Sequence, residues 1–300
     1  MNRWWISGAV LTLMLAAVSG IRAEDKPAQG EEEEQEEAQP EAPKEERIFP
    51  IYRNERFGFV DRDNEFVVEP EFENAGQISQ SLARVRAGGK WGYIDISGVL
   101  MIDPVYVDAR DFTEGLAAVK APAKGGDYWG YVSRSKRKFV VELQFEDALE
   151  FSEGLAAVKQ AGKYGYISKA GSMMIKPRFD EAGRFSEGIA CVRVGAKWGY
   201  INRLDKLLID YQFEDAAPFM EGLARVRMGS KWGLVDREGK LVIVPQFEDI
   251  GPFSEGMARV KRGTKWGFVD RTGALIMPPD FDEAWDFVDV QSTLLKATTP

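Results

Sequence analysis

Pairs of acidic residues recur along the chain, and they are the side chains best suited to chemistry. An aromatic residue precedes each pair and a small or apolar residue follows it, as in Phe145-Glu146-Asp147-Ala148, Phe179-Asp180-Glu181-Ala182, Phe213-Glu214-Asp215-Ala216 and Phe247-Glu248-Asp249-Ile250. Two carboxyl groups in different environments can hydrolyse a glycosidic bond. An active site needs such a pair once, whereas these acids recur at one position of a repeated unit. The pattern therefore favours acids that hydrogen-bond within turns, and the alternative is a glycan- or peptidoglycan-active hydrolase that uses only Asp and Glu.

Other catalytic and ligand-binding signatures are absent from the sequence. None of the 300 residues is histidine, which excludes Ser-His-Asp and Cys-His catalysis and zinc sites that contain histidine. A Walker loop, a dinucleotide-binding glycine fingerprint and a nucleophile elbow are also missing. The segment Asp61-Arg62-Asp63-Asn64-Glu65 comes nearest to a calcium loop, but it occurs once and contains an arginine. We therefore expect a protein that is not an enzyme and that needs no cofactor or metal.

A repeated unit positions these acids, and its most regular feature is an aromatic residue followed by glycine. Such regular spacing is typical of repeat proteins, in which each unit buries its apolar side against its neighbours. Seven of these anchors occur, at intervals of 34, 38, 35, 34, 34 and 34 residues: Phe57-Gly58, Trp91-Gly92, Trp129-Gly130, Tyr164-Gly165, Trp198-Gly199, Trp232-Gly233 and Trp266-Gly267.

Each unit contains three short strands by its hydrophobic pattern. In the sixth copy, residues 223–227, 232–236 and 241–244 are apolar or alternating runs separated by turn residues. The turn from Asp236 to Gly239 has the composition of a type I turn closed by a left-handed residue, and Asn64 replaces that glycine in the first copy. The sequence thus predicts an all-β fold of seven tandem repeats of about 34 residues, each a three-stranded β-meander, in an open curved stack. A seven-bladed β-propeller is the alternative, although its blades usually need about 40 to 45 residues.

The anchors and the bends between units resemble those of the bacterial WG-repeat, or KWG-repeat, family. The phrase Lys-Trp-Gly-Tyr-Ile occurs at residues 90–94 and 197–201, with close variants at 231–235 and 265–269, and bends such as Phe151-Ser152-Glu153-Gly154 recur between them. The resemblance covers about residues 48 to 290. It implies a β-repeat fold, and it brings no catalytic residue or common ligand that could be transferred to this chain.

The anchor aromatics have two interpretations, a shared core or an exposed stacking platform. Trp232 shares one strand face with Leu234, as Trp266 does with Phe268, and a row that is apolar throughout is usually core. Trp, Tyr and Phe fill similar buried space, which agrees with the substitutions among the anchors. We therefore favour structural anchors over a platform for sugars or peptides, and we expect the glycine to allow close approach of a neighbouring chain.

The first 47 residues differ in composition from the repeats. Residues 1–23 have a basic start, an apolar stretch of signal-peptide length and small residues before position 24, which indicates a Sec signal peptide. Residues 24–47 hold eleven acidic and three basic residues, including the run Glu31-Glu32-Glu33-Glu34, and such a composition predicts a disordered linker. Residues 48–300 then form the repeat domain. These features place the protein outside the cytoplasm, in the periplasm or the extracellular space.

Cys191 is the one cysteine of the chain, which excludes an internal disulfide framework. The equivalent positions of other repeats include Arg84, Arg225 and Arg259. A position that accepts long charged side chains is expected to face solvent, and we expect no functional role for the thiol.

These observations favour a binding protein over an enzyme. Because the acidic linker carries a net charge of −8 and residues 1–23 carry two arginines, the repeats hold only −3 of the chain's −9, which argues against a basic nucleic-acid groove. We expect the partner to be a protein or a cell-envelope polymer, and the mature chain to lack a transmembrane segment. The second and third anchors are separated by four extra residues within 121–128, so Tyr128 at this hairpin is a possible partner contact.

Overall fold

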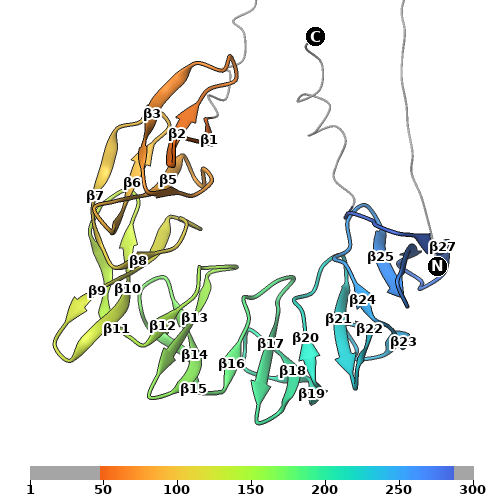
Figure 1. Ribbon diagram of the computed structural model, residues 1–300. Coiled ribbons are helices and arrows are strands. Elements are labelled where there is room, and N and C mark those ends of the chain that lie inside the picture. Colours follow the sequence, from red (N-terminus) through yellow and green to blue (C-terminus); the bar gives the residue numbers. More distant parts are fainter. Residues whose placement is uncertain (1–47, 287–300) are drawn as a thin grey trace, which may run out of the picture. The chain divides into compact units, whose positions relative to one another are not determined.

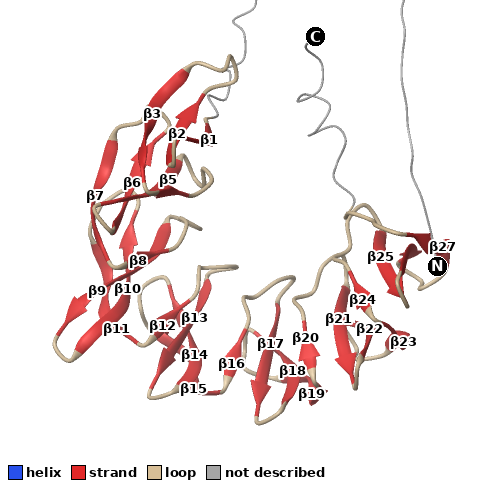
Figure 2. Ribbon diagram, in the orientation of Figure 1, coloured by secondary structure: helices blue, strands red, loops and turns tan. Residues whose placement is uncertain are grey.

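The computed structural model describes residues 48–286, and these residues form seven antiparallel β-sheets without a helix (Figure 1, Figure 2). The expected signal peptide and acidic linker, together with residues 287–300, lie outside the described residues. Each sheet contains one aromatic-glycine anchor, so the predicted all-β tandem repeats are confirmed. No helix long and apolar enough to span a membrane occurs among residues 48–286.

The strand bounds show how regular the sheets are. The first sheet has three strands, β1 (Phe49–Arg53), β2 (Arg56–Val60) and β3 (Phe66–Phe72). The second and third sheets contain β4 (Asn74–Ala75), β5 (Leu82–Ala87), β6 (Lys90–Asp95) and β7 (Leu100–Tyr106), then β8 (Asp108–Ala109), β9 (Leu116–Ala123), β10 (Gly126–Ser133) and β11 (Phe139–Phe145). The fourth and fifth contain β12 (Asp147–Ala148), β13 (Leu155–Gln160), β14 (Lys163–Ser168) and β15 (Met173–Phe179), then β16 (Glu181–Ala182), β17 (Ile189–Val194), β18 (Lys197–Asn202) and β19 (Leu207–Phe213). The sixth and seventh contain β20 (Asp215–Ala216), β21 (Leu223–Met228), β22 (Lys231–Asp236) and β23 (Leu241–Phe247), then β24 (Asp249–Ile250), β25 (Met257–Arg262), β26 (Lys265–Asp270) and β27 (Leu275–Phe281).

The predicted meander forms the three long strands of every sheet. In six of the seven sheets a short fourth strand is added by the second position of the acidic pair, which is Asn74 in the second sheet, and the residue after it. In the fourth sheet, Asp147 and Ala148 pair with Lys159 and Val158 of β13. The acidic bend therefore ends one sheet and begins the next. As a result, the sequence unit that starts at an anchor spans parts of two sheets.

The anchor glycine is required by a bulge in the third long strand. In the fourth sheet the pairing of β14 with β15 shifts register between Tyr164 and Tyr166. A Cβ atom added to Gly165 would lie 2.4 Å from the Ile175 carbonyl oxygen and 2.7 Å from the Pro177 nitrogen. The same close approach recurs at the other six anchor glycines, with Cβ-to-oxygen distances between 2.4 and 2.7 Å. The expected close approach of a neighbouring chain is confirmed, and that chain is the bulged strand.

The core lies between consecutive sheets. Tyr131 and Phe145 of the third sheet pack with Phe151 and Val158 of the fourth, and all four side chains are at most 2% exposed. Six such clusters join the seven sheets pairwise. Each unit thus buries its apolar faces against its neighbours, as the repeat spacing predicts.

Candidate functional site

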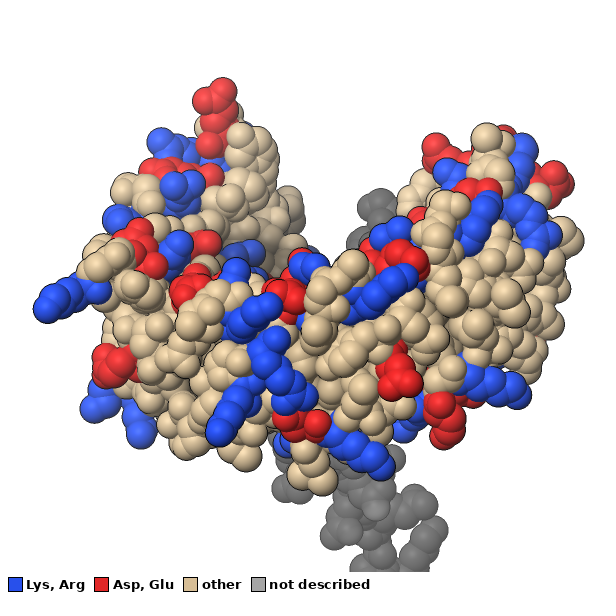
Figure 3. Space-filling view, turned by 90° about the horizontal axis from the view of Figure 1, so that it is seen from below, with Lys and Arg blue, Asp and Glu red and all other residues tan. Residues whose placement is uncertain are grey.

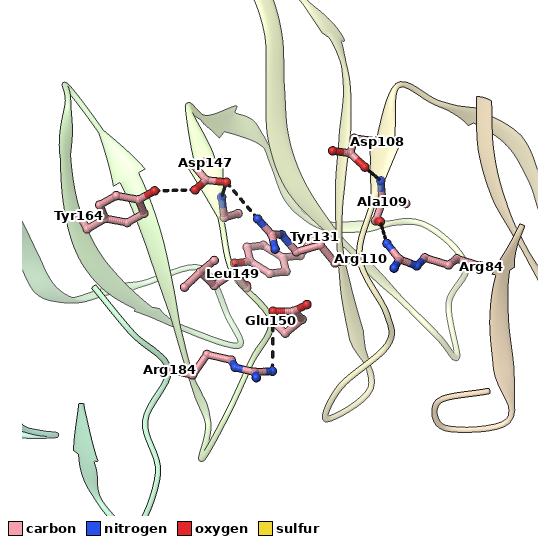
Figure 4. Close-up of polar contacts among 11 residues, drawn as sticks. Arg84, Asp108, Ala109, Arg110, Tyr131, Asp147, Leu149, Glu150, Tyr164 and Arg184 are labelled. Atoms are coloured by element: carbon pink, nitrogen blue, oxygen red, sulfur yellow. Dashed lines mark hydrogen bonds and ion pairs between the residues drawn. The ribbon is translucent and has the colours of Figure 1, made fainter. Parts of the chain in front are cut away.

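The two-residue strand of each four-stranded sheet, the residue before it and the three residues after it form what we call the short-strand edge. These positions carry the paired acids of the sequence, so they are the place to examine for chemistry. The two acids of a pair have different surroundings, because the first lies beside a hairpin turn and the second lies nearer the adjoining sheet. Figure 4 shows this edge where the third and fourth sheets meet.

The first acid of each pair closes the hairpin of its own sheet. A Glu214 carboxylate oxygen accepts a hydrogen bond of 3.0 Å from the Gly229 N–H, and another lies 2.6 Å from Lys197 Nζ, beside the anchor Trp198. The Lys197 ammonium group and the Gly229 N–H hold the pKa of Glu214 below its usual range, although desolvation opposes them. Equivalent backbone bonds join Gly89 to Glu73, Gly162 to Glu146 and Gly195 to Asp180. These first acids therefore have a turn function.

The second acid faces the neighbouring repeat. Asp147 accepts a 2.5 Å hydrogen bond from the Tyr164 hydroxyl group and lies 3.3 Å from Arg110 Nη2 of the preceding sheet (Figure 4). Burial, and then the Asp147 carboxylate, raise the pKa of the Tyr164 hydroxyl group. Asp147 thus bridges two sheets, and each of its carboxylate oxygens already accepts a hydrogen bond. This arrangement fits a structural contact better than a group that acts on a substrate.

Asp111 of one repeat is affected electrostatically by Glu150 of the next. Burial, and then the charge of Glu150, raise the pKa of Asp111, while Arg84 opposes this shift. Arg84 Nε lies 3.0 Å from Asp111, and its Nη1 donates to the Ala109 carbonyl oxygen at 2.8 Å. Glu150 lies 3.8 Å from Arg184 Nη1 (Figure 4). Each of these acids has a nearby arginine, so the edge presents alternating charges. Figure 3 shows acidic and basic side chains interspersed over the face that it displays.

The anchor aromatics are structural side chains that are mostly not fully enclosed. Trp129 is 5% exposed, and the other six, Phe57, Trp91, Tyr164, Trp198, Trp232 and Trp266, are partly buried. Cationic groups cover several of the rings: Arg110 lies 5.2 Å from the Trp129 ring and Arg259 lies 4.8 Å from that of Trp266. A sugar could stack on such a ring only by displacing the cation, so the geometry fits an anchor better than an open platform.

A second series of acids links consecutive repeats, and the sequence did not reveal its role. The glutamate of each Ser-Glu-Gly bend accepts a hydrogen bond from the N–H of the glycine in the following bend. Gly154, Gly188, Gly222 and Gly256 donate in this way to Glu114, Glu153, Glu187 and Glu221, at 2.9 to 3.0 Å. Desolvation would raise the pKa of Glu187, but the guanidinium of Arg237 and the Gly222 N–H hold it below its usual range. The recurrence of this glutamate at the same position of each repeat is the sequence feature that could have indicated a contact between repeats.

Tyrosine and serine hydroxyl groups add further bonds between repeats. Tyr131, two residues after its anchor, donates to the Leu149 carbonyl oxygen at 2.7 Å (Figure 4). Tyr93, Tyr166 and Tyr200 make the same bond at 2.7 to 2.9 Å. Ser152 donates to the Phe185 carbonyl oxygen at 2.6 Å, and Ser79 and Ser186 do likewise. The family-like phrases are therefore contacts between repeats.

Two other features singled out by the sequence are the β9–β10 hairpin and the calcium-like segment. Tyr128 lies in the β9–β10 hairpin, which is longer than the equivalent hairpins, and its side chain is partly buried. Asp61 accepts hydrogen bonds of 2.9 Å from the N–H groups of Asp63 and Glu65, which makes the calcium-like segment a closed turn. Among residues 48–286, no group of three potential metal ligands is arranged to hold an ion.

The expectation that Cys191 faces solvent is wrong. Its side chain is 3% exposed, and burial raises the thiol pKa to about 12. The equivalent arginines do not extend into water either, because Arg84 and Arg225 donate to carbonyl oxygens of the next sheet at 2.8 and 2.6 Å. The position lies between sheets, where either a small side chain or a paired guanidinium fits.

Comparison with known proteins gives a clear result at the level of sequence family. The family described as WG containing repeat matches residues 57–91, 91–121, 129–164, 164–198, 198–232, 232–266 and 266–289. No curated protein matches the chain.

Solved structures with a similar arrangement of sheets are distant in sequence. Hsv2 of Kluyveromyces lactis is 10% identical with a TM-score of 0.44, over 64% of this chain and 70% of that one. The dihydro-heme d1 dehydrogenase NirN is 9% identical with a TM-score of 0.47, over 77% and 63%. A protein from Desulfotomaculum acetoxidans is 13% identical with a TM-score of 0.42, over 78% and 97%.

Proposed function

We propose that this chain, which belongs to the WG-repeat family, is an exported, non-catalytic repeat protein that binds a protein or a cell-envelope polymer. The observation that carries the proposal is the fixed display of charged groups along the short-strand edge. Arg84 and Arg225 each donate to a carbonyl oxygen of this edge in the next sheet, at 2.8 and 2.6 Å. Side chains held in place before binding lose less entropy on binding, which favours recognition of an extended partner.

The same geometry supports binding over hydrolysis. Hydrolysis by carboxylates needs one protonated acid and one free carboxylate on either side of a substrate. Asp111, whose pKa is raised, is the best candidate acid, but Arg84 lies 3.0 Å from it, and its neighbour Glu150 has Arg184 as a counter-ion. A hydrolase would require Asp111 and Glu150 together. The double variant Asp111→Asn, Glu150→Gln should therefore leave any release of fragments from purified peptidoglycan at the wild-type level.

The β9–β10 hairpin is the second part of the proposed contact surface. Residues 124–127 at its tip are exposed, and Tyr128 follows them as the one large aromatic side chain there. Long surface loops cost little stability, so shortening this hairpin should leave folding intact. If the hairpin contacts the partner, removal of residues 122–125 and the variant Tyr128→Ala should both weaken partner capture.

The test is capture of partners from a native envelope extract by the full chain. Wild-type protein is compared with Arg110→Gln at the short-strand edge, with Tyr128→Ala, and with Arg62→Gln as a control in an exposed turn of the first repeat. We expect Arg110→Gln and Tyr128→Ala to reduce capture and Arg62→Gln to leave it unchanged. Equal capture by all four proteins would contradict these two surfaces. Export is tested separately, by N-terminal sequencing of the protein from the extracytoplasmic fraction.

A further inference from the structure

A shallow pocket of about 360 Å³ lies between the second and third sheets, away from the short-strand pairs described above. Its lining residues are Gln80, Gly115, Arg134 and Ser135. Gln80 belongs to the bend before β5, Gly115 to the bend before β9, and the other two to the turn after β10. The pocket is therefore at the Ser-Glu-Gly bends, where consecutive repeats are linked.

In three later repeats the equivalent place contains a glutamate paired with a cation: Glu114 with Lys169, Glu187 with Arg237 and Glu221 with Arg271. Glu221 accepts a 3.0 Å bond from the Gly256 N–H and lies 3.0 Å from Arg271 Nε. Glu114 similarly accepts a bond from Gly154 and lies 2.9 Å from Lys169. The cation comes each time from the turn between the second and third long strands of the following sheet. Each such link is thus a neutral set of one carboxylate and one cation.

The link between the second and third repeats lacks this carboxylate. Gln80 has the φ angle of the equivalent glutamates, 52° compared with 50° for Glu114, and its amide oxygen accepts a 2.7 Å bond from the Gly115 N–H. Arg134 takes the place of the cation, and its Nη1 donates to the Gln80 carbonyl oxygen at 2.6 Å. Within residues 48–286, no acid forms an ion pair with Arg134. The guanidinium keeps its charge and most of its five donors for another oxyanion.

The turn that supplies Arg134 is strongly basic. Arg134, Lys136, Arg137 and Lys138 are all exposed, and none of them is in an ion pair with an acid of the described residues. The nearby turn of the second sheet contributes Asp95. Burial alone would raise the pKa of Asp95, but hydrogen bonds from Ser97 and Val99, and then the charge of Arg137, hold it below its usual range. Asp95 is occupied by those backbone bonds, so the turn retains an excess of positive charge.

We propose that this pocket and the basic turn bind an acidic peptide segment. One carboxylate would pair with Arg134 where the other repeats place their own glutamate, and neighbouring acids would face Lys136 and Lys138. The proposal deepens the proposed function, on which it rests, by naming the chemistry of a protein partner. A peptide is favoured over a nucleic acid because the basic turn is short and the repeats carry a net charge of −3, which would repel a long polyanion elsewhere. The occupant is an acidic segment of a protein partner, and the acidic residues 31–37 of this chain serve as the test peptide.

The test uses a fluorescent synthetic peptide with the sequence of residues 31–37, titrated with the full chain at low ionic strength. We expect Arg134→Gln to weaken binding about tenfold, as the loss of a charge-assisted hydrogen bond implies. Gln80→Glu should weaken it similarly, because it restores the internal carboxylate for Arg134. Arg237→Gln changes the equivalent cation three repeats further along, outside the pocket, and should leave binding unchanged.

A variant of the full chain tests whether its own acidic residues occupy the pocket. In this variant the six glutamates at positions 31–34, 36 and 37 are replaced by glutamine. Tighter peptide binding by this variant would show that the chain's own acids occupy the pocket, which would overturn the assignment to a partner, whereas unchanged binding agrees with that assignment. Absence of binding in both backgrounds, or equal binding by wild type and Gln80→Glu, would overturn the proposal. Envelope capture through Arg110 and Tyr128 can succeed or fail independently of these results.

Discussion

Replacing an anchor glycine with alanine should destabilise the repeats by steric conflict alone. In the variant Gly165→Ala, the new methyl group would lie 2.4 Å from the Ile175 carbonyl oxygen and 2.7 Å from the Pro177 nitrogen. Ordinary contact begins near 3.4 Å, so the bulged backbone of β15 must move by about 1 Å. Because both contacts are backbone atoms, rotation of a side chain cannot relieve them.

The magnitude follows from two opposing effects. Overpacking in a well-packed region costs about 1 to 3 kcal/mol, and a conflict with backbone belongs at the upper end of that range. Alanine also restricts the unfolded chain, which favours folding by about 0.4 to 1 kcal/mol. We therefore expect Gly165→Ala to lower the free energy of unfolding by about 2 kcal/mol or slightly more.

Gly162 provides a matched control in the same hairpin. Its φ angle is +77°, and a Cβ atom there would meet no heavy atom within 4 Å. Gly162→Ala should therefore cost only the left-handed conformation of alanine, about 1 kcal/mol. Urea unfolding monitored by tryptophan fluorescence gives both free energies. The dependence of the free energy of unfolding on urea concentration should be the same in both variants as in the wild type. If Gly165→Ala costs no more than Gly162→Ala, the close approach of the bulge does not explain the aromatic-glycine motif.

Three further predictions concern the contacts between repeats. Trp129→Ala should cost about 3 to 5 kcal/mol in urea unfolding, and Trp198→Ala should cost less because its side chain is only partly buried; the reverse order would contradict the placement of these rings. Tyr131→Phe should cost about 1 to 2 kcal/mol, since the Leu149 carbonyl oxygen loses its donor, and an unchanged urea midpoint would mean that water replaces it. Folding lowers the pKa of Glu187. The ionised side chain therefore stabilises the fold above about pH 4.3, and this stabilisation is lost as the pH falls through the lower pKa of the folded state. Glu187→Gln should therefore make the free energy of unfolding less dependent on pH in the acid range.

The sequence predicted the periodic features of the fold better than its contacts. Gly92 and Gly239 could be assigned to a close approach and a turn because each glycine has a local steric reason that recurs in every copy. The acidic bend was harder to assign, since Asp147 and Ala148 pair with Lys159 and Val158 of β13, which lie twelve and ten positions away. Cys191 was misplaced because the equivalent arginines suggested solvent, whereas Arg225 is paired with backbone between two sheets. Alignment of copies shows which residues alternate at a position, but it does not show what they contact.

The hydrogen bonds between repeats have a direction that affects how such arrays can change. The tyrosine, serine and glutamate bonds, and those of Arg84 and Arg225, take their side chain from the earlier repeat and their backbone atom from the later one, as with Tyr131 and Leu149 or Glu187 and Gly222. Arg134 is an exception, because it donates to the Gln80 carbonyl oxygen of the earlier repeat. A backbone atom is available whatever residue carries it, so the upstream copy alone determines these bonds at a junction. For these hydrogen bonds, loss of a C-terminal repeat leaves side-chain donors and acceptors without partners, whereas loss of an N-terminal repeat leaves backbone groups without partners. Recombination can therefore append or exchange downstream copies more freely than upstream ones.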